Sequence, residues 1–145
     1  MTNLSSLKNG ATIHVSTSFH IDHPPSSILD DSNSFFMTTG LFPQEVIINL
    51  NASCQIERFV LEASGLSLAE IYLTDDQQIS QHTNWMAVCE LSGTTSDGAL
   101  ESFYSEASRL DNPISATHIR LRILSGIDPF VAIKQLITTG SVLSR

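Results

Sequence analysis

The sequence predicts an all-β protein built as a two-sheet jelly-roll sandwich. Several segments alternate apolar and polar residues with a period of two, as strands buried on one face do. Turn signals rich in glycine, aspartate and asparagine separate these segments, which is typical of packed antiparallel sheets. The chain has 145 residues, the usual size of one domain, so we predict a single jelly-roll domain over residues 1–145.

Five segments carry the alternation, and they are residues 11–16, 46–50, 69–74, 85–91 and 117–124. The last of them, THIRLRIL, is the clearest, because an aliphatic residue occupies every second position. The side chains expected to face the core are Ile13, Val15, Val46, Ile48, Leu50, Ala69, Ile71, Leu73, Trp85, Ala87, Cys89, Leu91, Ile119, Leu121 and Ile123. Residues 55–62 and 130–138 alternate less regularly, as expected of strands with both faces partly covered.

Residues 99–110, ALESFYSEASRL, fit two kinds of element. Their apolar residues have the spacing of an amphipathic helix. Phe103 and Tyr104 also suit a strand, and the neighbouring segments are strands. We therefore predict a strand here and keep the helix as the alternative.

The formal net charge of −8 limits the classes of partner. An acidic surface repels polyanions, so we expect no nucleic-acid binding and no adsorption to anionic lipid. No apolar run approaches the roughly 18 residues that a transmembrane helix needs, so we expect no direct insertion into a membrane. The N-terminus lacks the pattern of a signal peptide, and we expect a reducing cytosolic compartment in which Cys54 and Cys89 stay free thiols.

The common catalytic motifs are missing from the sequence. It has no GxGxxG, no Walker loop, no HExxH and no GxSxG. Ser5 and Lys8 match the spacing SxxK, but that motif needs a helix start and further partners, and these two residues lie in a polar N-terminus. No nucleophile–base pair is apparent either, so we predict that the protein is not an enzyme.

Two short stretches contain residue types that bind metals. His20, Asp22 and His23 are ligand types that zinc accepts, but no complementary cluster supplies a fourth ligand, and we interpret them as a solvated loop. Residues 30–34, DDSNS, carry the oxygen atoms that calcium prefers, although Phe35 stands where an EF-hand loop requires glycine. This stretch is therefore either a calcium loop between strands or a polar turn.

Residues 23–45, HPPSSILDDSNSFFMTTGLFPQE, resemble the corresponding stretch of the intraflagellar transport protein 25 family, also called heat shock protein beta-11. The most specific block is TTGLFPQE, residues 38–45. Supporting matches are His23–Pro25, Ile28, Asp30, Ile56–Arg58, Asn84–Trp85, Ser115–Thr117, Arg120, Ser125, Asp128 and Phe130. The resemblance spans almost the whole chain.

The resemblance implies a galactose-binding-like fold of the discoidin type, in agreement with the strand pattern. It also implies a non-catalytic subunit of the B complex of intraflagellar transport. Such a subunit pairs with a Rab-like small GTPase, intraflagellar transport protein 27, and joins other subunits of the transport train. It supports cargo transport and is found in the cilium or flagellum and in the cytoplasm near the basal body. The alternative is a glycan-binding module of the discoidin type, but such a module needs aromatic residues on loops, whereas the single Trp85 lies in a predicted strand.

The family fold often holds calcium near this opening stretch, and the matching positions here are Ser27, Asp30 and Ser34. Serines replace ligands that the family supplies, and Thr139 stands where relatives can supply a glutamate. Because calcium affinity depends on the charge of its ligands, the resemblance implies a degraded loop with weak or absent calcium binding.

Residues 23–45 are best interpreted as a structural corner that joins the first strand to the sheet. Pro24 and Pro25 favour an extended entry, and we expect the three residues from Phe35 to Met37 to anchor the loop in the core.

The sequence does not locate the partner interface. Tyr72, Phe103 and Tyr104 are candidates for a contact surface, with burial in the core as the alternative. We expect His14 and His118, on the polar faces of strands, to be surface histidines.

Overall fold

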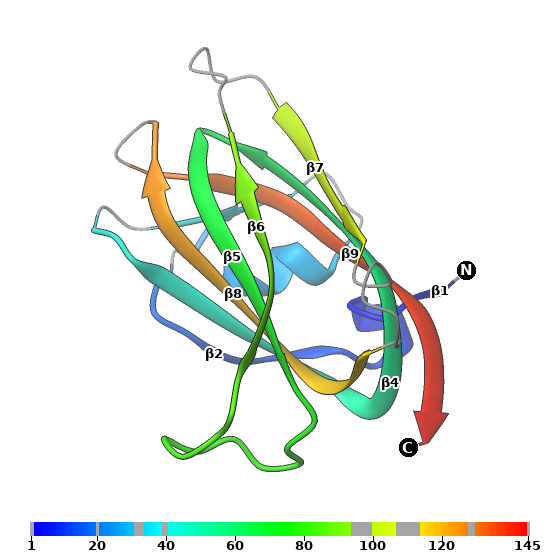
Figure 1. Cartoon of the computed structure of the whole chain (residues 1–145). Coiled ribbons are helices and arrows are strands. Elements are labelled where there is room, and N and C mark those ends of the chain that lie inside the picture. Colours follow the sequence, from blue (N-terminus) through cyan, green and yellow to red (C-terminus); the bar gives the residue numbers. More distant parts are fainter. Residues whose placement is uncertain are drawn as a thin grey trace.

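The computed structural model describes residues 2–19, 21–30, 34–38, 41–93, 100–106, 114–127 and 130–144. Its strands pair antiparallel and form two layers around a hydrophobic core (Figure 1), as the sequence predicts. The elements in order are β1 (Thr2–Asn3), η1 (Leu7–Asn9), β2 (Thr12–Ser16), η2 (Pro25–Leu29), β3 (Phe36–Met37), β4 (Gln44–Ser64), β5 (Leu66–Thr74), β6 (Met86–Ser92), β7 (Leu100–Glu106), β8 (Ile114–Gly126) and β9 (Ala132–Ser144). The two η elements are single short 3-10 helices.

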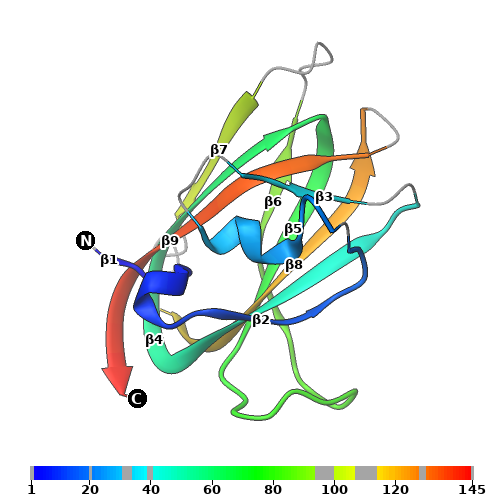
Figure 2. The same ribbon diagram turned by 180° about the vertical axis from the view of Figure 1, so that it is seen from behind.

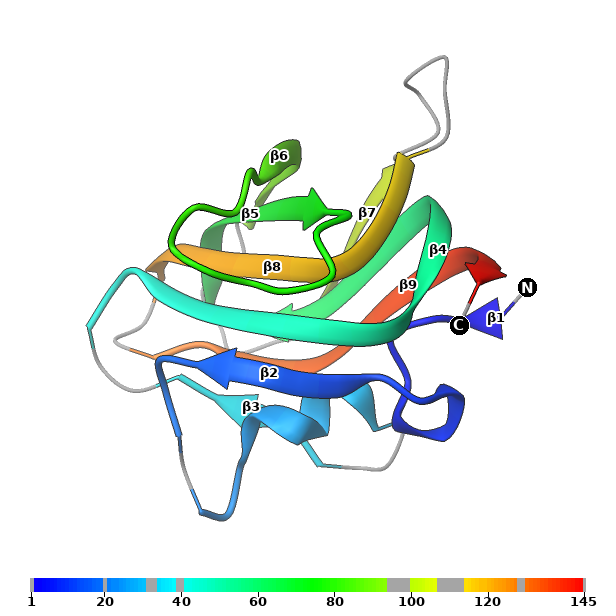
Figure 3. The ribbon, with the colours of Figure 1, turned by 90° about the horizontal axis from the view of Figure 1, so that it is seen from below.

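β4 takes part in both layers. Residues 46–49 pair with β2 and residues 58–64 pair with β7, while β8 runs along the first part of β4 and β9 along the second. The pairing with β8 shifts register between Asn49 and Cys54. Asn51 lies within this shift with a φ of 55°, a left-handed conformation that asparagine tolerates better than most residues. The strand turns back on itself here (Figure 3), so one continuous segment connects the two sheets.

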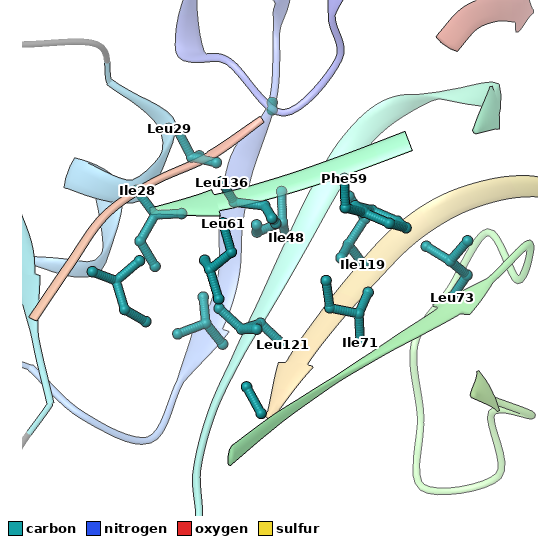
Figure 4. Close-up of a cluster of buried hydrophobic side chains, with 14 of the residues drawn as sticks. Ile28, Leu29, Ile48, Phe59, Leu61, Ile71, Leu73, Ile119, Leu121 and Leu136 are labelled. Atoms are coloured by element: carbon teal, nitrogen blue, oxygen red, sulfur yellow. The ribbon is translucent and has the colours of Figure 1, made fainter. Parts of the chain in front are cut away.

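The core fills the space between the two sheets (Figure 4). The first sheet has the order β2-β4-β8-β5-β6, and its inward side chains include Ile48, Ile71 and Ile119. The second sheet contributes Phe59, Leu61 and Leu136 from β4 and β9. Most of the predicted inward residues are buried, and these are Val46, Ile48, Leu50, Ala69, Ile71, Leu73, Leu91, Ile119, Leu121 and Ile123.

Two expected core residues face solvent, because the strand pairing shifts where the sequence alternation does not show it. Val15 is 46% exposed, since β2 shifts register against β4 between Ile13 and Val15. Ala87 is exposed for the same reason: β6 shifts against β5 between Ile71 and Tyr72, so Ala87 pairs with Tyr72 on the outer face. A one-residue shift in pairing places the side chains on its two sides out of step, so that those beyond it face the other side of the sheet.

The segment that fitted either a strand or a helix is a strand where it is described. β7, Leu100–Glu106, pairs with residues 58–64 of β4. The helical alternative is therefore wrong for residues 100–106, and residues 99 and 107–110 lie outside the described part.

The corner formed by residues 23–45 is anchored in the core, as predicted, but with fewer side chains than expected. Phe36 is fully buried, and η2 buries Ile28 and Leu29 beside it. Phe35 is only half-buried and stacks on His23, with ring centroids 4.0 Å apart. Met37 is half-buried as well, so the corner is held mainly by Phe36 and η2.

We predict that Phe36→Ala lowers the free energy of unfolding by about 3–5 kcal/mol, because it removes a fully buried ring and leaves a cavity. Urea denaturation followed by the fluorescence of Trp85 measures this change. Phe19→Ala is the matched control: its ring is exposed, so we expect a change within about 0.5 kcal/mol. Equal losses in the two variants would contradict the proposed anchoring of the corner.

Candidate functional site

The three residues that match the family's calcium loop lie in one corner of the fold. Ser27 is buried in η2, and its carbonyl accepts the N–H of Asp30 at 3.2 Å. Asp30 follows η2 and Ser34 precedes β3, both half-buried; residues 31–33 between them are outside the described part. Among the described residues no group of three or more His, Cys, Asp or Glu side chains could hold a metal ion. The described loop therefore offers a single carboxylate, which fits a strong calcium site poorly.

The residues considered for zinc are not brought together as a site in the described part. Asp22 is exposed, and His23 is half-buried with its ring against Phe35. His20 lies outside the described residues. Neither Asp22 nor His23 belongs to a cluster of three potential ligands there.

The outer face of the first sheet carries a row of side chains that crosses all five strands. The strand register aligns Val15, Ile47, Arg120, Tyr72 and Ala87. The guanidinium of Arg120 lies 5.5 Å from the ring centroid of Tyr72 and 5.7 Å from that of Trp85. Trp85 therefore lies on the outer face of the sheet, and the prediction that it faces the core is wrong. Of the three residues considered for a contact surface, Tyr72 is on this face, while the side chains of Phe103 and Tyr104 lie outside the described part.

The charges on this face are paired with one another. Glu45 binds the guanidinium of Arg120, and its Oε1 lies 3.2 Å from Nε of Arg122. That Nε is close enough for an ion pair but lacks hydrogen-bond geometry. Tyr72 donates a hydrogen bond of 2.7 Å to Glu70, and this bond, with partial burial and the charge of Glu70, raises the pKa of Tyr72. These side chains are partly exposed, and ion pairs near the surface contribute little to stability.

A polar pocket of about 290 Å³ opens where β4 bends. Its walls carry amides, hydroxyls and an imidazole, and they are formed by Asn49, Asn51, Ala52, Ser53, Gln77, Thr117, His118 and Ser144. Asn51 also fixes the bend, because its side-chain amide donates to the carbonyl of Gly10 at 2.7 Å. Among the described residues no Phe, Tyr or Trp lines the pocket, so it lacks the large aromatic faces on which sugar rings stack.

His118 is a wall of this pocket and is 3% exposed, so the expectation of a surface histidine is wrong. Thr117 donates its hydroxyl hydrogen to the carbonyl of Asp76 at 2.6 Å. Its oxygen lies 2.9 Å from Nδ1 of His118, which must then be the donor, because a hydroxyl has one hydrogen. Burial lowers the pKa of His118, and repulsion from His14, 5.8 Å away between ring centroids, lowers it further.

No family model matches the chain. The intraflagellar transport protein 25 homolog of Homo sapiens is 29% identical over 137 residues, which cover 94% of this chain and 90% of that protein. The homolog of Mus musculus is 28% identical over 142 residues, which cover 97% and 94%. The predicted resemblance to the intraflagellar transport protein 25 family is confirmed. Because it spans nearly the whole chain, the likeness to intraflagellar transport protein 25 homologs includes both the corner and the sheet.

Solved structures support the predicted jelly-roll fold. The family 32 carbohydrate-binding module of C. perfringens NanJ, in complex with galactose, superposes with a TM-score of 0.70 and 19% identity, covering 89% of this chain and 93% of that chain. Chitosan-binding module 1 of a chitosanase/glucanase from Paenibacillus superposes with a TM-score of 0.71 and 20% identity, covering 97% and 100%. At these identities the likeness shows the jelly-roll fold and does not extend to the ligands of these modules.

We predict that acid destabilises the protein through His118. Because the pKa of His118 is lower in the folded protein than in the unfolded chain, the unfolded chain takes up a proton more readily. The folded protein therefore loses stability as the pH falls below about 6.5, the pKa of histidine in an unfolded chain. Urea unfolding at pH 7.5, 6.5 and 5.5 should show this decline, and His118→Gln should flatten it. The control is His82→Gln, which alters an exposed histidine and should leave the decline unchanged. A wild-type slope in His118→Gln would rule out His118 as its source.

Proposed function

We propose that the chain is a non-catalytic subunit of the B complex of intraflagellar transport. The observation that carries this proposal is similarity from end to end: the human homolog aligns over 94% of this chain and 90% of its own length. Such coverage leaves little of either protein outside the alignment, so the likeness concerns the whole molecule and not one shared motif. The names of both relatives connect them with intraflagellar transport.

In this proposal the partner is a Rab-like small GTPase subunit, intraflagellar transport protein 27, together with other subunits of the transport train. The protein then works by binding, in a cilium or flagellum and in the cytoplasm near the basal body. The described residues suit binding more than catalysis, because large apolar side chains such as Ile21 and Leu41 stand in solvent. No described helix has the length and hydrophobicity needed to cross a membrane. A permanent pair of this kind is expected to bury more than about 2,000 Å².

The described residues offer little support for glycan binding. The polar pocket at the β4 bend has no Phe, Tyr or Trp among its described walls, and Arg120 lies over the ring of Trp85. Sugar recognition by a jelly roll of this size would need such a ring for stacking.

The test is a complex between the purified chain and the intraflagellar transport protein 27 homolog of the same cell. Size-exclusion chromatography with light scattering should give a one-to-one complex that survives dilution, because permanent interfaces dissociate slowly. A Rab protein of membrane traffic, loaded with the same nucleotide, is the control and should elute separately. Separate elution of both GTPases, with retention of the chain on a galactose or chitosan matrix, would replace this proposal with glycan binding.

We also propose that the corner with Ser27, Asp30 and Ser34 binds calcium weakly or not at all. With a dissociation constant of 1 mM or more, 1 mM calcium stabilises the fold by at most about 0.4 kcal/mol. Thermal unfolding in 1 mM calcium chloride should therefore match that in EDTA to within a degree or two. A rise of several degrees that Asp30→Asn abolishes would show that the loop is an intact calcium site.

A further inference from the structure

Three loops at one end of the sandwich display large apolar side chains in solvent. Phe19 is 67% exposed, Ile21 81%, Leu41 83% and Phe130 47%. They lie on the loops that follow β2, precede β4 and precede β9. We call these four residues the loop-end surface. Single exposed apolar residues are ordinary, but several on adjacent loops are typical of a surface that another molecule covers.

Hydrogen bonds bring the three loops together. The N–H of Thr17 donates to the carbonyl of Glu45 at 2.9 Å, and the hydroxyl of Ser18 donates to the side chain of Gln44 at 2.6 Å. The amide of Gln44 donates in turn to the carbonyl of Leu41. These bonds join the loop of Phe19 and Ile21 to the loop of Leu41.

The third loop is joined in the same way. Thr38 donates its N–H to the carbonyl of Val131 at 2.9 Å and accepts the N–H of Val131 on its hydroxyl at 2.9 Å. Phe130, next to Val131, is thereby held beside the loop of Leu41. Figures 2 and 3 both show the three loops at the end of the sandwich opposite the chain termini.

The backbone under this surface is anchored, although its side chains are exposed. Ser18, Thr38, Gln44 and Val131 are all buried. A partner that docks here would find the loops already in place and would not have to order them, which lowers the entropic cost of binding. Such preorganisation is expected of loops that bind a partner, whereas loops without a binding role do not require it.

The charges around this end favour a protein over a lipid surface. The sequence has no Lys or Arg between residues 9 and 57 or between residues 123 and 133, which together contain all three loops, and Arg120 and Arg122 of the neighbouring β8 are paired with Glu45. Interfacial binding to anionic membranes depends on such basic residues. The acidic Asp22 is exposed beside Ile21, and Asp30 is partly exposed in the neighbouring corner. This end therefore suits a partner with an apolar centre and basic residues at its rim.

We propose that the loop-end surface is the docking site for this chain's protein partner. The matching surface of that partner would be an apolar patch rimmed by Lys or Arg. The inference rests on the proposed function in taking that partner to be the small GTPase subunit. Aliphatic and aromatic side chains at its centre would carry most of the affinity, and the acidic residues around them would speed association.

The test compares two leucines at opposite ends of the molecule. Leu41→Lys places a positive charge at the centre of the loop-end surface, whereas Leu143→Lys makes the same change on β9, where Leu143 is 54% exposed near the C-terminus. Isothermal titration of each variant with the intraflagellar transport protein 27 homolog gives the affinities. We expect Leu41→Lys to weaken binding at least tenfold and Leu143→Lys to leave it within twofold. Both leucines are exposed, so thermal unfolding should confirm that both variants remain folded.

The possible outcomes separate this inference from the proposed function. If Leu41→Lys binds the GTPase as tightly as the wild-type protein does, the proposed docking site is wrong, but the proposed pairing with the GTPase is retained. Absence of wild-type binding would overturn both. If the wild-type protein co-sediments with phosphatidylcholine vesicles and Leu41→Lys does not, the surface binds lipid. If the wild-type protein dimerises and Leu41→Lys does not, the surface binds a second copy of the chain. Either result would overturn the proposal. As a further check, Asp22→Asn should slow association at low salt if the rim of the partner is basic.

Discussion

The structure depends on the bend in β4, because this one strand is hydrogen-bonded into both sheets. Asn51 takes the left-handed conformation there, and its side chain holds the turn through the carbonyl of Gly10. The return half of the strand then lies so close to β9 that a Cβ on Gly140 would be 1.9 Å from the carbonyl oxygen of Gln55. Only glycine fits at that position. Because β4 is paired in both sheets, the way this one strand turns positions the second sheet opposite the first, with the core between them.

The bend also creates the environment of His118. Where β4 leaves the first sheet, Asn49 and Asn51 form one wall of the polar pocket and Thr117 and His118 of β8 form another. The imidazole is buried beside the bend, next to the ring of His14, and its hydrogen-bond partner Thr117 is itself bound to the start of the β5–β6 connection through Asp76. Burial of a group that is usually charged in acid thus arises from the same geometry that builds the sandwich.

Alternation in the sequence predicts the strands and most of the core, because inward positions of β4, β5 and β8 must be apolar whatever the loops do. It fails at Val15, Ala87 and Trp85. At Val15 and Ala87 a register shift between two strands places the side chain on the other face, and such a shift depends on pairing between distant segments. Trp85 lies just before β6, outside the paired strand, and its ring lies beside Arg120 on the outer face. The burial of His118 is missed for a related reason: it depends on His14 and on the start of the β5–β6 connection, which are distant in the sequence and meet only in the fold. Asn51, an asparagine within an apolar stretch, was the available sign of a bend.

Two exposed surfaces remain as candidates for binding, and their chemistry differs. On the outer face of the first sheet, Glu45 is paired with Arg120 and Arg122, and Arg120 is covered by Tyr72 and Trp85. A partner there would have to compete with contacts that the chain already makes for itself. At the loop end, the hydrogen bonds hold the backbone, while the exposed areas of Phe19, Ile21 and Leu41 remain uncovered. Covering apolar area gives roughly 25 cal/mol per Å² without breaking any internal contact. The loop end therefore gains more from a partner than the sheet face does, although the sheet face contains the aromatic and arginine residues that dominate many interfaces.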